Sequence, residues 1–218
     1  MKRTYEQSKT FFQIRHTDKR GCDRELYKTP YYMIEQIVDS IILHRPDLSN
    51  ILWVDPCAAD GRWEDVIISR GIRCKSYDLV PLKDNVEKMN FYEMEKPNEE
   101  IFIIGNPPFS ELKKFVDKAL SISNECYFLG GSQIITGKLA NKVSLLHRFE
   151  GHEGNQKDRR SKITFIDSND KNVAVWCCGA IFNNKDNKSF VRGEVPKDNT
   201  FRTSVKCFCE EDERVIKI

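Results

Sequence analysis

The chain has 218 residues, of which 39% are hydrophobic and 31% are charged. That length fits one domain with small additions, and the composition is typical of a globular protein rather than a wholly disordered one. The 35 basic and 33 acidic residues give a net charge of +2, which excludes attachment to nucleic acid through bulk charge alone. Any such binding therefore requires local patches of positive charge.

Membrane and secretory signals are missing from the sequence as given. No apolar run approaches the ~20 residues of a membrane span, and the basic N-terminus lacks the apolar core of a secretory signal. None of the eight cysteines forms a C-x-x-C pair. We expect a protein of the reducing cytoplasm, with no membrane association, no disulfide framework and no bound metal.

The first part of the chain predicts alternating helices and strands after a basic arm, residues 1–24. Thr29 is predicted to cap a helix with Pro30 at its first position, and apolar residues then recur every three or four positions. A buried strand at 51–55, a short helix from Trp63, a strand at 73–78 and a weaker strand at 86–91 follow.

The second part continues the alternation and ends in a predicted hairpin. The pattern predicts, in order, a strand at 101–105, a helix capped by Ser110, a strand at 125–129 and a helical stretch at 139–149. Two apolar runs, 162–166 and 173–182, are separated by a polar turn, which indicates a hairpin. We expect a core over residues 25–183 and a polar C-terminal extension over 184–218.

This order of elements predicts an α/β fold, with a mostly parallel sheet, helices on both faces and a C-terminal antiparallel hairpin strand. Ligands of such sheets bind outside the carboxyl ends of the strands, where the winding reverses. That rule selects the turn after Val54, the acid Asp78 and the turn after Ile104.

The turn at 55–61, Asp-Pro-Cys-Ala-Ala-Asp-Gly, combines small residues with two acids. Small residues let the backbone approach a ligand, and the following helix start offers free N–H groups. The two carboxylates would repel a phosphate, and the glycine patterns of dinucleotide-binding and P-loop proteins are missing. These features favour a cationic ligand bearing an amino acid, and Asp78 could accept hydrogen bonds from a ribose diol.

The turn at 106–109, Asn-Pro-Pro-Phe, is the most specific motif in the chain. The side-chain carbonyl of Asn106 and the backbone carbonyl of Pro107 can both accept hydrogen bonds, and the prolines stiffen the loop. Phe109 adds an aromatic face. The alternatives are a pocket for a planar ring that bears an amino group and a rigid strand–helix turn with a core phenylalanine.

Taken together, these motifs resemble the S-adenosylmethionine-dependent amino-methyltransferases that modify adenine, less often cytosine, in DNA or RNA. Residues 55–61 are similar to the family's D-P-x-A-G-x-G cofactor loop, although Ala59 replaces its second small glycine. Residues 106–109 are similar to its [DNS]-P-P-[YFW] catalytic tetrad, and 27–30 look like the segment that precedes its core. The resemblance covers roughly residues 25–182 and implies a Rossmann-like class I methyltransferase fold.

The resemblance also implies roles for individual residues. Asn106 and Pro107 would accept the two N–H bonds of the target amine, and Phe109 would stack on the base. The implied catalytic residues are Asn106, Pro107, Pro108 and Phe109. The implied cofactor-binding residues are Tyr27, Thr29, Pro30, Asp55, Pro56, Ala58, Asp60, Gly61, Asp78, Asn90 and Phe91. In the polar loop 150–161, Arg159 and Arg160 could contact phosphates, or the loop is simply a solvated one.

The function that this resemblance implies is methyl transfer to the exocyclic amino group of adenine in DNA. Adenine in RNA is the first alternative. Methylation of a glutamine side chain and a non-catalytic binding subunit also remain open. No large target-recognition domain follows the core in this sequence. We therefore expect nucleic acid as the partner, and either a homodimer or a partner subunit that supplies target recognition.

Overall fold

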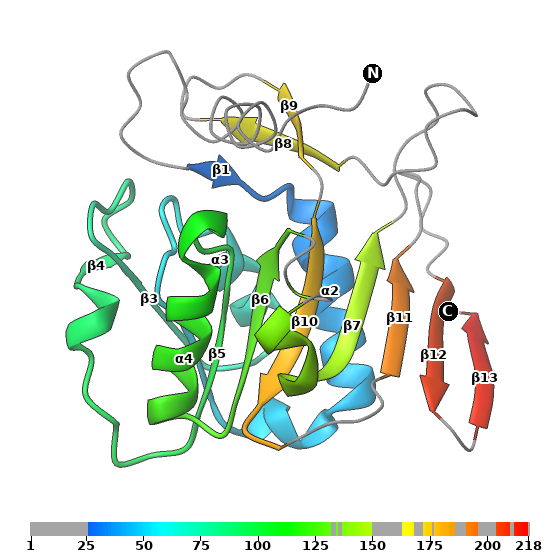
Figure 1. The fold of residues 1–218 in the computed structure, drawn as a ribbon. Helices are drawn as coiled ribbons and strands as arrows, with labels where there is room; N and C mark the ends of the chain where they lie inside the picture. The colour runs from blue at the N-terminus through cyan, green and yellow to red at the C-terminus, as the bar shows by residue number, and fades with distance from the viewer. Residues whose placement is uncertain are drawn as a thin grey trace, which may run out of the picture.

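The computed structural model describes residues 26–131, 134, 137–149, 163–167, 172–175, 177–185, 191–195, 204–209 and 212–217. Helices cover both faces of one large β-sheet, and a smaller sheet lies beyond the carboxyl ends of its parallel strands (Figure 1). The basic arm 1–24 and the loop residues Arg159 and Arg160 lie outside the described residues, so the roles assigned to them stay predictions.

The first half of the described chain alternates helices and strands as predicted. Its elements are β1 (Tyr27–Lys28), α2 (Tyr31–His44), the 3-10 helix η1 (Pro46–Asn50), β2 (Leu52–Asp55), α3 (Arg62–Ser69), β3 (Cys74–Asp78), β4 (Glu87–Lys88) and the 3-10 helix η2 (Phe91–Glu93).

The second half is richer in strands. Its elements are β5 (Ile101–Gly105), η3 (Phe109–Glu111), α4 (Leu112–Ile122), β6 (Glu125–Gly130), η5 (Gly137–Lys142), β7 (Val143–Phe149), β8 (Ile163–Asp167), β9 (Asn172–Val175), β10 (Cys178–Asn183), β11 (Val191–Val195), β12 (Ser204–Cys209) and β13 (Asp212–Lys217).

The large sheet has eight strands in the order β11-β7-β10-β6-β5-β2-β3-β4. Strand β10 is antiparallel to both of its neighbours, and every other pairing in the sheet is parallel. The chain runs outward from β2 through β3 to β4 and then returns to the other side of β2 as β5. The winding therefore reverses between β2 and β5, where open α/β sheets bind ligands. The mostly parallel sheet that the sequence predicted is confirmed.

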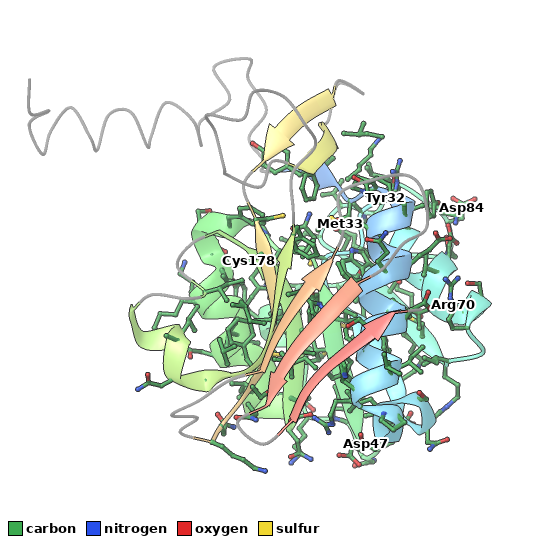
Figure 2. All side chains as sticks on the ribbon, turned by 90° about the vertical axis from the view of Figure 1, so that its right-hand side faces the viewer. Tyr32, Met33, Asp47, Arg70, Asp84 and Cys178 are labelled. Atoms are coloured by element: carbon green, nitrogen blue, oxygen red, sulfur yellow. The ribbon has the colours of Figure 1, made fainter. Side chains whose placement is uncertain are left out.

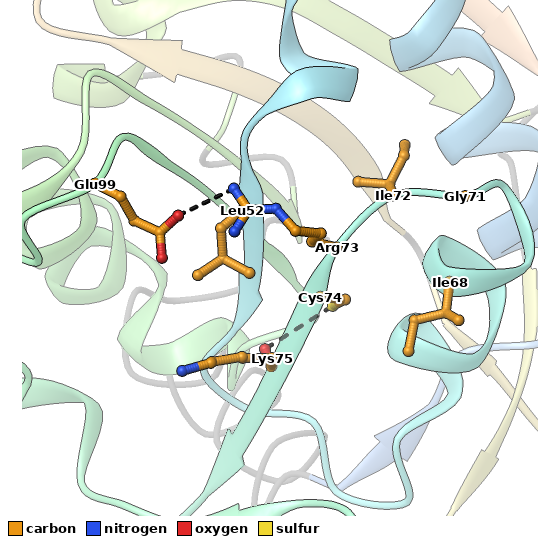
Figure 3. Close-up of a pocket in the computed structure, with 8 residues that line it drawn as sticks. All are labelled: Leu52, Ile68, Gly71, Ile72, Arg73, Cys74, Lys75 and Glu99. Atoms are coloured by element: carbon orange, nitrogen blue, oxygen red, sulfur yellow. Dashed lines mark hydrogen bonds and ion pairs between the residues drawn. The ribbon is translucent and has the colours of Figure 1, made fainter.

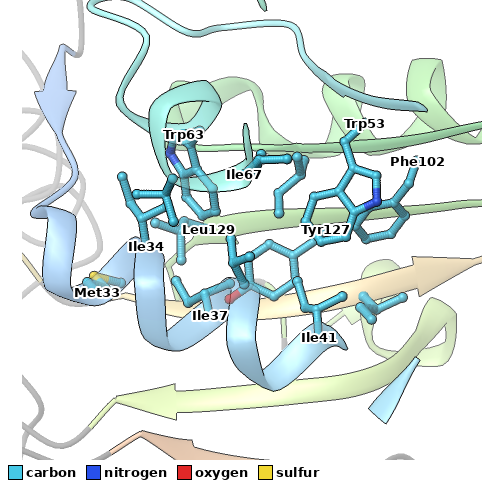
Figure 4. Packing of buried hydrophobic residues seen from close by; sticks show 14 of the residues in the cluster. Met33, Ile34, Ile37, Ile41, Trp53, Trp63, Ile67, Phe102, Tyr127 and Leu129 are labelled. Atoms are coloured by element: carbon cyan, nitrogen blue, oxygen red, sulfur yellow. The ribbon is translucent and has the colours of Figure 1, made fainter. Parts of the chain in front are cut away.

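Side chains that alternate along the central strands build two separate cores. Trp53 and Phe102 face α2 and α3, whereas Val54 and Ile103 face α4. Figure 4 shows the first cluster, where α2 packs against Trp53, Phe102 and Tyr127. Because the central strands β2 and β5 are buried on both faces, this part of the sheet is rigid and its carboxyl edge can hold loops in fixed positions.

Helix α2 lies along one face of the sheet, with Met33 near one end and Asp47 just beyond the other (Figure 2). Its predicted apolar face is buried, as Ile34, Ile37, Val38 and Ile41 show. The prediction for its start was wrong by one residue. Pro30 is the N-cap, and no side chain caps the helix. Thr29 makes a different contact, described below.

Three further predictions of secondary structure need correction. The stretch 139–149 is not one helix, because the 3-10 helix η5 ends at Lys142 and the strand β7 follows it. Strand β7 packs on both faces of the sheet, so its apolar run lacks the alternation that distinguishes a strand from a helix. The run 173–182 is divided between β9, which pairs with β8, and β10, which enters the large sheet. Helix α4 begins at Leu112 after a 3-10 turn, so Ser110 is not its cap.

Candidate functional site

The two predicted motifs meet at the carboxyl ends of adjacent strands. Val54 of β2 pairs with Ile103 of β5, so Asp55 and Gly105 end neighbouring strands. A Cβ atom on Gly105 would lie 2.6 Å from Asp55 Oδ1 and 3.1 Å from Cys57 Sγ. Only a glycine lets the two loops approach this closely. The 55–61 and 106–109 loops therefore share one edge of the sheet at the point where the winding reverses.

The backbone of the 55–61 loop folds back on itself and on β3. Ala59 and Gly61 have the positive φ angles 48° and 74°. The Gly61 N–H donates to the Ala58 carbonyl at 2.8 Å, and the Ala58 N–H donates to the Tyr77 carbonyl at 2.9 Å. Pro56 and Ala58 are buried. This tight turn leads directly into α3, whose first N–H groups face the same edge.

Asp55 is a fully buried acid at the base of this loop. Its Oδ1 accepts a hydrogen bond from the Cys57 N–H at 3.1 Å, whereas Oδ2 has no partner among the described residues. Burial, which the negative charge of Asp78 reinforces, raises the pKa of Asp55 to about 8. Burial and the charge of Asp55 also raise the pKa of the Cys57 thiol. A nearby cation would relieve this unfavourable electrostatic environment.

Asp78 and Asp60 both have protein partners. Asp78 Oδ2 accepts from the Ala59 N–H at 2.9 Å, and its Oδ1 accepts from the Val80 N–H at 2.8 Å. Asp78 thus ties the end of β3 to the 55–61 loop. Asp60 forms an ion pair with Arg62 at 2.8 Å. Each carboxylate oxygen can accept a further hydrogen bond, so these contacts leave the predicted ligand roles untested.

Asn106 is held by a segment far away in the sequence. Its Nδ2 donates to the Tyr27 carbonyl at 2.8 Å and to Thr29 Oγ1 at 3.2 Å. Its Oδ1 is buried and has no hydrogen-bond partner within the described part of the chain. A buried acceptor without a partner is unusual and requires an explanation. The amide therefore has one satisfied side and one side still able to accept a hydrogen bond.

The rest of the 106–109 motif forms a stiff turn. Pro108 precedes the 3-10 helix η3, and its carbonyl accepts from the Glu111 N–H at 2.9 Å. Pro107 is buried, and Phe109 is only 8% exposed and packs into the core beneath α2. Most of the Phe109 ring is therefore used in packing, and its stacking on a base stays a prediction.

Asn90 and Phe91, predicted to contact the cofactor, have local structural partners. Asn90 Oδ1 accepts from the Tyr92 N–H at 3.1 Å, and its Nδ2 donates to Glu93 at 2.8 Å. Phe91 is buried and stacks on Phe115 with ring centroids 5.2 Å apart. Their predicted contacts with a cofactor stay untested.

Sequence reasoning missed Tyr92. This side chain is 39% exposed, and its hydroxyl donates to Glu111 at 2.9 Å, directly after the 106–109 motif. Burial and the Glu111 carboxylate raise the pKa of Tyr92. In the sequence, the only signal that could have pointed to Tyr92 is its aromatic ring directly after Asn90-Phe91. Tyr92 thus links the loop after β4 to the turn after β5.

A shallow pocket of about 470 Å³ lies at the amino ends of the parallel strands, opposite the two motifs (Figure 3). Leu52 and Cys74 line it at the amino ends of β2 and β3, and Arg73 forms a 3.0 Å ion pair with Glu99 across it. Because the motifs lie at the carboxyl ends, this pocket is not part of the candidate site. No cluster of three potential metal-binding side chains occurs among the described residues.

Comparisons with known proteins support the fold. By sequence, neither a family model nor a curated protein matches the chain. By structure, a candidate RNA methyltransferase from Pyrococcus horikoshii aligns with a TM-score of 0.53 and 15% identity, over 73% of this chain and 86% of that one. The chain has the fold of the Rossmann-like methyltransferases.

Two proteins of restriction-modification systems align similarly. The type I methyltransferase subunit from Streptococcus thermophilus has a TM-score of 0.51 and 10% identity, over 78% of this chain and 47% of its own. The modification subunit of a candidate type I restriction enzyme from Vibrio vulnificus YJ016 has a TM-score of 0.50 and 9% identity, over 94% and 55%. This chain thus spans about half the length of these two subunits.

The described residues contain no helix with the length and apolarity that a membrane crossing needs.

The five cysteines with described side chains are free thiols: Cys57, Cys74, Cys126, Cys177 and Cys178.

Proposed function

We propose that this protein transfers a methyl group from S-adenosylmethionine to the exocyclic amino group of adenine in DNA. The observation that carries the proposal is that two loops meet at the ends of adjacent strands. One holds a buried acid, and the other holds an asparagine whose acceptor has no partner among the described residues. The methyltransferase fold of the chain and of its structural neighbours supports it.

The residues of the 55–61 loop fit a cationic nucleoside donor. Asp55 keeps one buried carboxylate oxygen without a partner among the residues that the structure describes, and its raised pKa indicates an environment that a cation would improve. The turn at Ala59 and Gly61 brings the backbone close to the edge of the sheet. We assign the cofactor to this loop, with Asp78 near its ribose. When bound, S-adenosylmethionine supplies an electrophilic methyl group.

Asn106 would accept a hydrogen bond from the target amine through Oδ1, and Pro107 would accept the second through its carbonyl. The amine of adenine is a weak nucleophile because its lone pair is delocalised into the ring. Two fixed acceptors hold the nitrogen in position and stabilise the positive charge that develops on it. Because the amine becomes acidic only as the new bond forms, the mechanism requires no strong base beforehand.

Access of the substrate is also part of the proposal. Asn106 Oδ1 is buried in the absence of substrate, so the base must displace whatever covers it. A target in a duplex must also be flipped out of the stack, at a cost of a few kcal/mol. We assign phosphate contacts to the basic arm 1–24 and to Arg159 and Arg160. Because two of the similar structures are subunits, we also propose that a partner subunit or a second copy helps to select the target.

The test incubates the purified protein with S-adenosylmethionine labelled in its methyl group and with separate pools of DNA, RNA and protein. We expect label in DNA, on adenine N6. Label in RNA alone would favour the RNA alternative, and label in protein alone would favour the glutamine one. Binding of S-adenosylmethionine without transfer to any pool would indicate a non-catalytic subunit.

The matched variants for this test are Asn106→Ala and Asn124→Ala. Asn124 is an exposed asparagine before β6 that donates to Glu100, at the opposite end of the sheet from the site. Asn124→Ala should transfer methyl groups like the wild type. Asn106→Ala should lose transfer but keep its affinity for S-adenosylmethionine. Equal turnover in the two variants would refute the role of Asn106.

A further inference from the structure

We propose that Thr29 is a positioning residue that, with the Tyr27 carbonyl, fixes the Asn106 amide so that Oδ1 is presented to the target amine. This inference rests on the proposed function and deepens it. The observation behind it is that both described contacts of Asn106 Nδ2 come from the segment before α2, at 2.8 and 3.2 Å. The motif residue is therefore oriented from outside its own loop.

The Tyr27 carbonyl decides which way the amide faces. A carbonyl oxygen can only accept a hydrogen bond, so the NH₂ end of the Asn106 amide must point toward it. An amide turned by half a rotation would place Oδ1 against the Tyr27 oxygen, with two acceptors in contact. The orientation of the amide therefore follows from its hydrogen bond to the Tyr27 carbonyl.

Thr29 supplies the acceptor for the second amide hydrogen. Its side chain is only 3% exposed, and its hydroxyl lies 3.2 Å from Asn106 Nδ2. Unlike the buried Oδ1 of Asn106, this hydroxyl oxygen already accepts a hydrogen bond from the amide. Without it, one N–H of the amide would be buried and unpaired, which favours rotation of the side chain. The geometry therefore assigns Thr29 to the amide, in place of a direct contact with the cofactor.

The segment that holds the amide is itself held by a strand from the second half of the chain. Strand β1 is antiparallel to β8, with Tyr27 opposite Asp167 and Lys28 opposite Ile166. Figure 1 shows β1, β8 and β9 as a small sheet beyond the carboxyl ends of the parallel strands. The Tyr27 carbonyl is thus placed by strand pairing, and the hydroxyl of Thr29 follows two residues later.

The experiment compares Thr29→Val, which keeps the shape of the side chain but removes its hydroxyl, with Thr29→Ser, which keeps the hydroxyl. Thr29→Val should lower kcat about tenfold, the effect of one lost hydrogen bond to the amide, and leave the Kd for S-adenosylmethionine unchanged. Thr29→Ser should restore kcat. A rise in that Kd with kcat preserved would overturn the inference and assign Thr29 to the cofactor.

A double-mutant cycle separates positioning from general damage to the fold. In the Asn106→Ala background the amide is missing, so Thr29→Val should change the residual rate less than about twofold. An undiminished tenfold loss in that background would show that Thr29 acts through something else. Thermal unfolding checks that each variant is folded, and Thr29→Ala serves as a second hydroxyl-free variant if Thr29→Val is not.

A readout that needs no activity distinguishes this inference from the proposed function. The side-chain NH₂ resonances of Asn106, identified by their loss in Asn106→Asp, should exchange slowly in the wild type and in Thr29→Ser. They should exchange at least several-fold faster in Thr29→Val. Unchanged exchange would refute the inference even if the enzyme is active. If the amide hydrogens exchange as expected but no pool receives a methyl group, the proposed function is refuted and the inference about Thr29 stands.

Discussion

Two regions of this molecule bury polar side chains, and they do so in opposite ways. Between α2 and the sheet, His147 is fully buried, with Nε2 3.0 Å from Ser40 Oγ and Nδ1 3.0 Å from the Tyr127 hydroxyl. Both ring nitrogens have partners. At the carboxyl edge, Asp55 Oδ2 and Asn106 Oδ1 are buried without partners among the described residues.

We interpret the paired His147 as a structural group, and the oxygens of Asp55 and Asn106 that lack a described partner as functional ones. A fully paired network satisfies its own hydrogen bonds and stabilises one arrangement of the core. Buried acceptors without partners cost stability, and a ligand at the carboxyl edge would complete the hydrogen bonds of Asp55 and Asn106. We therefore expect changes in the first region to affect stability and changes in the second to affect methyl transfer.

The largest expected effect is the loss of transfer in Asn106→Ala. Removal of one preorganised acceptor should lower kcat by about 10²–10³-fold. The free energy of unfolding should fall by only about 1–3 kcal/mol, because the Nδ2 hydrogen bonds to the Tyr27 carbonyl and the Thr29 hydroxyl are lost. Kinetics and urea unfolding on the same preparation measure both quantities. A large loss of stability with kcat intact would reverse the comparison between the two regions.

His147→Ala should have the opposite signature. It leaves a cavity and removes the partners of Ser40 and Tyr127, so unfolding should become easier by about 2–5 kcal/mol. The folded fraction should still bind S-adenosylmethionine with normal affinity. Urea unfolding and equilibrium binding test this, with His44→Ala, a partly buried histidine on α2, as the comparison. A selective loss of binding in His147→Ala would show that the network serves the site.

Gly105→Ala tests whether the two loops must touch. The new Cβ would lie 2.6 Å from Asp55 Oδ1, so overpacking should cost about 1–3 kcal/mol and displace the loops. Gly71→Ala is the control, since its φ is +77° but no described residue lies within 4 Å of a new Cβ. It should cost only about 1 kcal/mol, and cofactor affinity should fall in Gly105→Ala alone. Equal cofactor affinity in both variants would indicate that the close approach is unimportant.

Effects of opposite sign are expected from pH. The pKa of Asp55 is raised to about 8, so the folded state holds a proton that the unfolded state has lost, and this contribution to stability falls as pH rises from about 4 to 8. Burial lowers the pKa of His147 to about 3, so its contribution falls as pH decreases from about 6.5 to 3. Unfolding of Asp55→Asn and His147→Asn against the wild type, over a pH series, should show the two opposite trends.

The sequence located the two loops of the candidate site, because their motifs are local. Asp55 and Asn106 each end a short apolar run beside a tight turn, and strands buried on both faces are recognisable from such runs. Strand β7 was mistaken for a helix for the same reason, since an apolar run without clear alternation fits either structure. Tyr92 escaped notice because its contact with Glu111 spans 19 residues and leaves no local pattern.

By itself, the sequence determined the alternation of elements, the class of fold and the two loops at the strand ends. These features depend on side-chain periodicity and turn chemistry within a few neighbouring residues. Only the tertiary structure decided that β10 lies between β6 and β7, and that Thr29 holds the amide of Asn106 across 77 positions of the chain. The physical reason is that a hydrogen bond between distant residues forms only after strands and helices have packed together.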